Sequence, residues 1–213
     1  MQRAKEIIAI LESLYPNAHC ELNYEDDFQL LIAVILSAQC TDKRVNLVTE
    51  KLFKIASTPQ DFASMEQSEL EKHIFSCGFY KNKAKNIISA SKEIIEKYDG
   101  KVPSDFDALV SLPGVGRKTA NVVSSICFNS DGIAVDTHVF RTSNRLSLAN
   151  GKTPYEVEMG LYKVIPKNER ARVHHLLIFH GRYKCKSQSP DCEDCPLQKY
   201  CSYYQTKRGK ENE

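Results

Sequence analysis

Four cysteines near the C-terminus constrain the fold of this 213-residue chain more than any other feature. Cys185, Cys192, Cys195 and Cys201 are separated by six, two and five residues, a spacing that can bring four thiolates to one metal centre. Zinc sites of this type usually pair two Cys-x-x-Cys knuckles, whereas only Cys192 and Cys195 form one here. The spacing therefore leaves zinc and an iron-sulfur cluster both open.

Disulfides are the weakest interpretation of these cysteines, because the chain opens with charged residues and we expect no secretory signal. The longest apolar run, Leu30 to Leu36, is far shorter than the roughly 20 residues needed to cross a membrane. We therefore expect a cytoplasmic protein with no membrane contact. The other cysteines are expected to be small buried hydrophobic residues: Cys20, Cys40, Cys77 and Cys127.

Apolar residues recur at helical spacing along most of the chain, as at Ile7, Leu11 and Leu14. Asp27 is a plausible N-cap for the apolar segment that follows it, and prolines separate the helical segments. Residues 132–135 and 121–128 could form strands, but neither has an evident partner. The predicted fold class is all-α, and the charged residues 207–213 are expected to be disordered.

Charge is balanced overall, since 29 Lys and Arg face 27 Asp and Glu, so net charge indicates no nucleic-acid partner. Locally, one segment holds a single acid and seven basic residues: Lys163, Lys167, Arg170, Arg172, Arg182, Lys184 and Lys186. Such a stripe can follow a phosphate backbone or form a solvated helix face.

A second motif runs from Leu112 to Ala120, where Gly114 and Gly116 stand one residue apart between two helical segments. Such a turn exposes backbone N–H groups, and the next helix adds its positive end, which together suit a phosphate group. The motif follows a helix and lacks a third glycine, so a dinucleotide-binding fold is disfavoured.

Several segments together resemble one family. Leu112–Ala120 resembles the helix-hairpin-helix of DNA base-excision glycosylases, Val135–Arg141 resembles the segment that carries their aspartate, and Cys185–Cys201 has their iron-sulfur loop spacing. Leu36–Asp42 completes a match to the endonuclease III family, which are bifunctional glycosylases and abasic-site lyases for oxidised pyrimidines. The resemblance extends from Ala4 to Cys201.

The resemblance implies one 4Fe-4S cluster held by the four cysteines, and a monomer that acts on duplex DNA containing damaged pyrimidines or abasic sites. In a prokaryote it would be associated with the nucleoid. Two helical domains are implied: a six-helix barrel with the helix-hairpin-helix over residues 21–130, and a cluster domain of residues 1–20 and 131–213. DNA would bind in a groove between them.

Lys118 and Asp136 are the predicted catalytic residues. A glycosylase that also nicks the strand needs an amine that attacks C1′, displaces the base and remains as a Schiff base, and lysine provides one. A carboxylate can stabilise positive charge on the sugar or assist proton removal. Asp136 is also expected to cap the helix that starts at Thr137.

By resemblance, Gln39 fills the space left by the flipped base and Phe79 forms a wedge in the opposite strand. The family pattern has leucine at the position of Phe79, which puts the opposite-base preference in doubt. The remaining predicted DNA contacts are Leu112, Gly114, Gly116, His138, Arg182, Lys184 and Lys186.

Two other functions remain open at this point. A monofunctional adenine glycosylase would share the cysteines and Asp136, but is expected to lack a lysine at position 118 and to carry a further C-terminal domain. A DNA-binding module or a redox carrier would use the cluster without the pair of Lys118 and Asp136.

Overall fold

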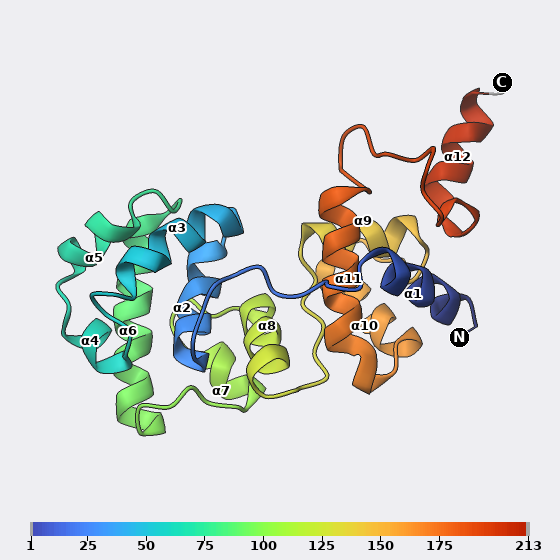
Figure 1. Ribbon diagram of the computed structural model, residues 1–213. Coiled ribbons are helices and arrows are strands. Elements are labelled where there is room, and N and C mark those ends of the chain that lie inside the picture. The colour runs from blue at the N-terminus through green and yellow to red at the C-terminus, as the bar shows by residue number, and fades with distance from the viewer. Residues whose placement is uncertain (1, 212–213) are drawn as a thin grey trace. The chain divides into compact units, whose positions relative to one another are not determined.

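The computed structural model describes residues 2–211, which fold into helices joined by loops of varied length (Figure 1). No strand occurs among these residues, so the predicted all-α class is confirmed. Residues 121–127 lie within a helix and residues 132–135 have no regular secondary structure, so neither candidate segment forms a strand. Within residues 2–211, no helix is long and apolar enough to cross a membrane.

The chain divides into two compact units. The first, here called the central unit, spans Glu21–Ser130; the second, the terminal unit, combines Met1–Cys20 with Asp131–Glu213. The central unit contains seven helices, one more than the resemblance implied, and two of them have only six residues. They are α2 (Asp27–Ser37), α3 (Asp42–Leu52), α4 (Pro59–Ser64), α5 (Gln67–Ile74), α6 (Tyr80–Tyr98), α7 (Phe106–Ser111) and α8 (Arg117–Cys127).

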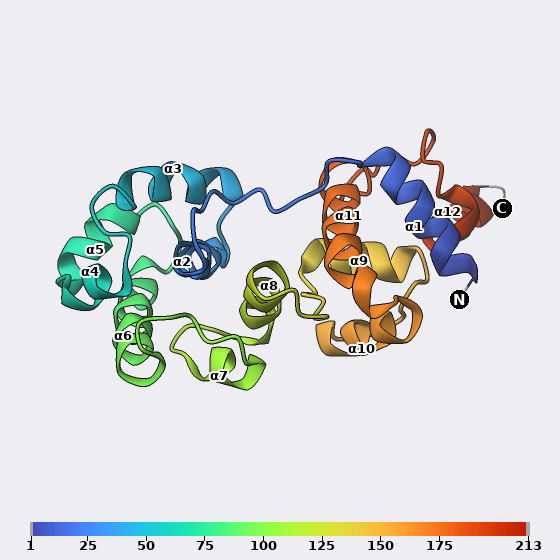
Figure 2. The same ribbon diagram turned by 60° about the horizontal axis from the view of Figure 1, so that its bottom comes forward.

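Helix α2 is the core of the central unit. Every residue from Phe28 to Leu36 is buried, which requires helices on all sides. Helices α3, α6 and α8 pack against it, as the nearly end-on view of α2 in Figure 2 shows. The N-cap is Asp26 and not Asp27 as expected, because Asp26 has the extended backbone that lets its carboxylate accept from the Gln29 amide at 2.8 Å.

Helices α7 and α8 form a hairpin around the Gly-x-Gly turn. Gly114 has φ +80, and a Cβ atom there would lie 2.8 Å from Cβ of Asn86 on α6. Only glycine suits this left-handed, closely packed position. The Arg117 guanidinium lies 5.1 Å from the centre of the Phe106 ring, so the first residues of the two helices are in contact.

The terminal unit is built around α11 (Arg170–Tyr183), which packs against α1 (Gln2–Leu14) and α9 (Thr137–Arg145). Helix α9 in turn contacts α10 (Pro154–Val164) and α12 (Ser202–Glu211). Two short 3₁₀ helices, Lys167–Glu169 and Gln198–Tyr200, complete the unit. The backbone is helical through residue 211, so the expectation of disorder was wrong for 207–211, and residues 212–213 lie outside the described part.

An ion pair joins the N-terminal helix to this unit across 160 positions of sequence. Arg172 on α11 donates to both carboxylate oxygens of Glu12 on α1, at 2.6–3.1 Å, and also to the carbonyls of Tyr15 and Pro16. These hydrogen bonds lower the pKa of Glu12 and place α1 beside α11 even though most of the chain separates the two helices.

We expect Gly114→Ala to lower the free energy of unfolding of the iron-loaded protein by about 1–3 kcal/mol, because of the strained backbone and the clash with Asn86. Gly116→Ala is the matched control. Its φ is −92 and an added Cβ meets nothing within 4 Å, so its unfolding free energy should change by less than about 0.5 kcal/mol. Equal losses in denaturant unfolding would contradict the role assigned to Gly114.

Candidate functional site

Lys118 lies exposed in the first turn of α8, two residues after the hairpin turn. Gly116 is the N-cap and has no side chain that could accept from the first amide groups of α8. The space around the position of a Gly116 Cβ is open, with no atom within 4 Å. An anion such as a DNA phosphate can therefore approach the positive end of α8 beside Lys118. Leu112 differs, since its side chain is buried in the core.

Gln39 and Phe79 occupy two neighbouring loops of the central unit. Both have left-handed backbone conformations, with φ of 54 and 57, and Phe79 is 65% exposed, so it is not a core residue. A Cβ at Gly78 would lie 3.6 Å from the Gln39 carbonyl oxygen, which shows how closely the loops approach. The two residues predicted to enter the duplex are thus brought together on one side of α2 and α6.

The sequence indicated no role for Lys83, which holds the Gln39 loop in place. Its ammonium group, buried on α6, donates to the carbonyls of Leu36 and Ala38 at 2.8 and 2.7 Å. These carbonyls end α2 and would otherwise be unsatisfied inside the protein. Burial lowers the pKa of Lys83. No local pattern distinguishes it from the neighbouring solvent-exposed lysines, because its partners lie 45 and 47 positions away.

Asp136 lies in the terminal unit and caps α9, as expected from the sequence. Its Oδ1 atom accepts from the amides of His138 and Val139 at 2.9 and 2.8 Å. His138 is half-buried, lies 3.3 Å from Arg141 through Nδ1, and packs so closely on Gly181 that a Cβ there would be 2.8 Å from the His138 Cβ. The start of α9 is therefore held rigidly by its cap and by α11.

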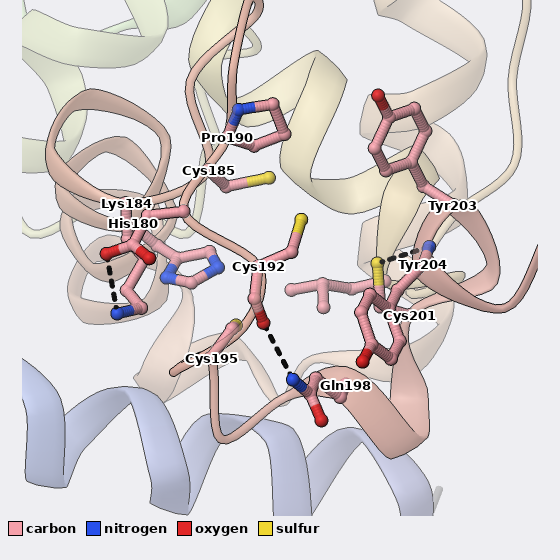
Figure 3. Close-up of a pocket in the computed structure, with 12 residues that line it drawn as sticks. His180, Lys184, Cys185, Pro190, Cys192, Cys195, Gln198, Cys201, Tyr203 and Tyr204 are labelled. Carbon is pink, nitrogen blue, oxygen red and sulfur yellow. Dashed lines mark hydrogen bonds and ion pairs between the residues drawn. The ribbon is translucent and has the colours of Figure 1, made fainter. Parts of the chain in front are cut away.

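The four C-terminal cysteines surround one cavity of about 350 Å³, part of which is open to solvent (Figure 3). Backbone and side-chain groups donate to the sulfurs: the Tyr204 amide donates to Cys201 Sγ at 3.4 Å, and Arg145 donates to Cys185 Sγ at 3.3 Å. Arg145 also binds the Lys186 carbonyl at 2.8 Å. Arg141 donates to the Cys185 carbonyl at 2.9 Å. Both arginines of α9 thus hold the cysteine loop, a role the sequence did not indicate.

The cavity suits an iron-sulfur cluster better than a single zinc ion. Burial raises the pKa of the Cys195 and Cys201 thiols, so their thiolates need a cationic partner such as iron. Burial also lowers the pKa of His180 on the cavity wall to about 4, so this side chain adds no positive charge at neutral pH. Among the described residues, no three potential ligands converge as around one ion. The thiols are instead spread around a space, as the four irons of a cluster require.

The basic segment is largely committed to partners inside the terminal unit. Lys167 and Arg170 both pair with Asp131, at 3.0 and 3.2 Å. Arg172 pairs with Glu12 and Lys184 pairs with Asp191, at 2.6 and 2.9 Å. At least these four of the seven basic side chains therefore have acidic neighbours. Lys163 and Lys186 are exposed and Arg182 is half-buried, so the surface that could follow a phosphate backbone is smaller than the sequence suggested.

Comparison with known proteins identifies the class of protein to which this chain belongs. Residues 32–167 match the family model of the HhH-GPD superfamily base excision DNA repair proteins, and residues 185–201 match the iron-sulfur binding domain of endonuclease III. The first match covers the hairpin and Asp136, and the second begins and ends at the outer two of the four cysteines. The chain is thus a helix-hairpin-helix base-excision repair protein with an iron-sulfur loop.

Individual relatives of known function identify the family within this class. Endonuclease III of Bacillus subtilis is 52% identical over 189 residues, covering 88% of this chain and 86% of the relative. Endonuclease III of Escherichia coli K12 is 44% identical over 205 residues, covering 95% and 97%. A solved structure of a trapped covalent endonuclease III–DNA intermediate has 48% identity and a TM-score of 0.94, covering 97% of this chain and 98% of that one.

The chain belongs to the endonuclease III family. It is a DNA glycosylase with abasic-site lyase activity that acts on oxidised pyrimidines, and it carries one 4Fe-4S cluster. This family membership excludes the two other functions that the sequence left open, an adenine glycosylase and a DNA-binding module or redox carrier.

We expect the protein to contain about four irons per chain, and Cys192→Ser to lower that number by more than half, because a cluster ligand is lost. Cys127→Ser in the central unit is the control and should keep the full iron content. Iron and zinc would be measured by elemental analysis of purified protein. Full iron in Cys192→Ser, or stoichiometric zinc in the wild type, would contradict the assignment of this thiol.

We expect Lys186→Ala to reduce the slope of log K against log salt for duplex DNA by about one unit, since an exposed lysine beside a phosphate displaces about one counterion. Lys167→Ala is the matched control, because Lys167 pairs with Asp131. Its slope should equal that of the wild type. Binding titrations at several salt concentrations measure the slopes of both variants. An unchanged slope for Lys186→Ala would show that Lys186 does not contact a phosphate.

Proposed function

We propose that Lys118 is the nucleophile of both reactions. The observation that carries this proposal is its position: an exposed amine in the first turn of α8, directly after a hairpin turn that has open space beside Gly116. Phosphate bound at that turn would fix the DNA backbone beside the amine. The proposal is also supported by the trapped covalent DNA intermediate of the structural relative.

The chemistry can be written for this lysine. The neutral Lys118 amine attacks C1′ of the damaged nucleotide, and the bond from C1′ to the base breaks with the electron pair leaving on the base. Loss of a proton from nitrogen and opening of the sugar give an iminium link. The iminium acidifies the C2′ proton, whose removal expels the 3′ phosphate by β-elimination. Water then releases the lysine.

Asp136 is proposed to assist this chemistry from the N-terminus of α9. Both capping hydrogen bonds are accepted by Oδ1, so Oδ2 can act towards the substrate while the cap stays intact. A carboxylate stabilises positive charge on the sugar as the base departs, or takes the proton of the attacking amine.

We propose that Gln39 and Phe79 enter the duplex when the damaged nucleotide leaves the stack. The 65% exposure of Phe79 supports its role as a wedge, since an exposed aromatic side chain can stack between bases. Backbone groups of the turn at Gly114 and Gly116 would bind phosphate, together with His138, Arg182 and Lys186. Lys184 would first have to leave Asp191, and Leu112 could contribute only its backbone.

The cluster is proposed to be structural, with all four cysteines as ligands. The cluster would cross-link the loop from Cys185 to Cys201. The two arginines of α9 hold this loop against the rest of the terminal unit. We further propose that the protein acts as a monomer, on duplexes with damaged pyrimidines or abasic sites, in the cytoplasm and, in a prokaryote, at the nucleoid.

Lys118→Gln should lose base release by at least about a thousandfold while binding damaged duplex with unchanged affinity, because glutamine keeps the length and polarity but has no nucleophilic amine. Lys92→Gln is the matched control, an exposed lysine on α6 outside the proposed site. Single-turnover excision of thymine glycol and a binding titration separate the two effects. Excision by Lys118→Gln at the wild-type rate would refute the proposed nucleophile.

Asp136→Asn should fold normally, because asparagine is an equally good N-cap. We expect it to slow excision of a damaged base more than it slows strand cleavage at a preformed abasic site, where no base has to be displaced. Rates on the two duplexes would be compared in parallel. Equal slowing on both would show that Asp136 acts at a step common to the two substrates, which contradicts a role in the departure of the base.

A further inference from the structure

Two thiols meet between the loops that carry Gln39 and Phe79. Cys40 directly follows Gln39, and Cys77 lies two residues before Phe79. Both are free thiols, and Cys40 is close enough to Cys77 to add to the effect of burial in raising the pKa of the Cys77 thiol. The sequence suggested only two scattered small hydrophobic residues, and nothing in the proposed mechanism uses either of them.

The surrounding backbone keeps these thiols together. The Gly78 backbone lies against the Gln39 carbonyl, at 3.6 Å from the position of a Cβ. Lys83 fixes the first of the two loops through the Leu36 and Ala38 carbonyls. The contact between Cys40 and Cys77 is therefore a property of the folded central unit and not of two mobile side chains.

The two cysteines differ in access and in charge environment. Cys77 is completely buried, whereas Cys40 is partly exposed. Burial raises the pKa of the Cys77 thiol to about 11, against the opposing effect of the Lys83 ammonium and the Arg44 guanidinium, the two cationic groups beside it. A reagent from solution thus reaches Cys40 first, and Cys77 can react only with a partner already inside the protein.

We propose that Cys40 and Cys77 are an oxidisable pair that closes to an intrachain disulfide in the presence of a low-molecular-weight disulfide, and that closure weakens binding to damaged DNA. The Cys40 thiolate attacks the external disulfide, forms a mixed disulfide and releases one thiolate. The Cys77 thiolate then attacks the Cys40 sulfur and releases the second. The two electrons and two protons of the protein thiols end on the two released thiols, so the exchange balances.

The effect on DNA follows from the shortening of the contact. A disulfide brings the two sulfurs to about 2.05 Å, well inside the separation of two thiols that are not bonded to each other. The loops holding Gln39 and Phe79 would be drawn together and locked, while insertion into a duplex needs both side chains at positions set by the DNA. This second half of the proposal rests on the proposed roles of these two residues; the disulfide itself does not.

The test uses the iron-loaded protein incubated anaerobically with glutathione disulfide, with the cluster absorbance recorded throughout. Free thiols are then alkylated and the protein is digested without reduction. Mass spectrometry should show the Cys40 peptide joined to the Cys77 peptide with the loss of two hydrogens, and the linking rate should rise with pH because it needs the Cys77 thiolate. Affinity for a thymine glycol duplex should fall by about tenfold and return on reduction.

Three variants make the test specific. Cys77→Ala should stop at glutathione on Cys40, and Cys40→Ser should form no link and keep its DNA affinity under oxidation. Cys127→Ser is the matched control and should link as the wild type does. Absence of the Cys40–Cys77 link from wild-type protein would overturn the proposal. A link that leaves DNA affinity unchanged would overturn the coupling, and neither result depends on the Lys118 chemistry, which is assayed in the reduced protein.

Discussion

The complete burial of α2 is the constraint on which the central unit depends. A helix whose residues 28–36 are all buried must be surrounded, and its neighbours α3, α6 and α8 carry or adjoin the proposed functional residues. Lys118 lies in the first turn of α8, Phe79 precedes α6, and Gln39 lies between α2 and α3. The buried Lys83 ammonium completes this arrangement, because it satisfies the carbonyls at the end of α2 and thereby holds the loop of Gln39. Burial of apolar side chains sets the positions of the helices, and the buried Lys83 ammonium sets the conformation of the Gln39 loop.

The terminal unit is organised by arginine side chains that bind backbone carbonyls. Arg172 joins α1 to α11, while Arg141 and Arg145 hold the cysteine loop against α9. Several planar donors on each guanidinium allow one side chain to satisfy several carbonyls of an irregular loop. Asp136 caps the N-terminus of the same helix α9. The cysteine loop and the proposed catalytic carboxylate are therefore fixed by one element, which is consistent with the structural role proposed for the cluster.

Much of this could be predicted from the sequence where the signal is local. Helical periodicity predicted the all-α class, and the turn at Gly114 followed from its two glycines. The cysteine spacing left zinc and iron-sulfur open until the cavity and the family match were known. Asp26 was missed as the N-cap because Asp27 beside it is an equally good candidate by composition. Lys83, Arg141 and Arg145 could not be identified because their partners lie about 40 positions away or more. The sequence overestimated the basic surface available to phosphate for the same reason, since Glu12, the partner of Arg172, lies 160 positions away.

The central claim, that the Lys118 amine forms the covalent link to DNA, is tested most directly by locating that link. Wild-type protein would be incubated with a thymine glycol duplex in the presence of borohydride, which reduces an imine to a stable amine. The adduct is then digested with protease and nuclease, and the modified peptide is sequenced by mass spectrometry. The account predicts a deoxyribose remnant on Lys118 and on no other amine. A remnant on the N-terminal amine or on another lysine would contradict it.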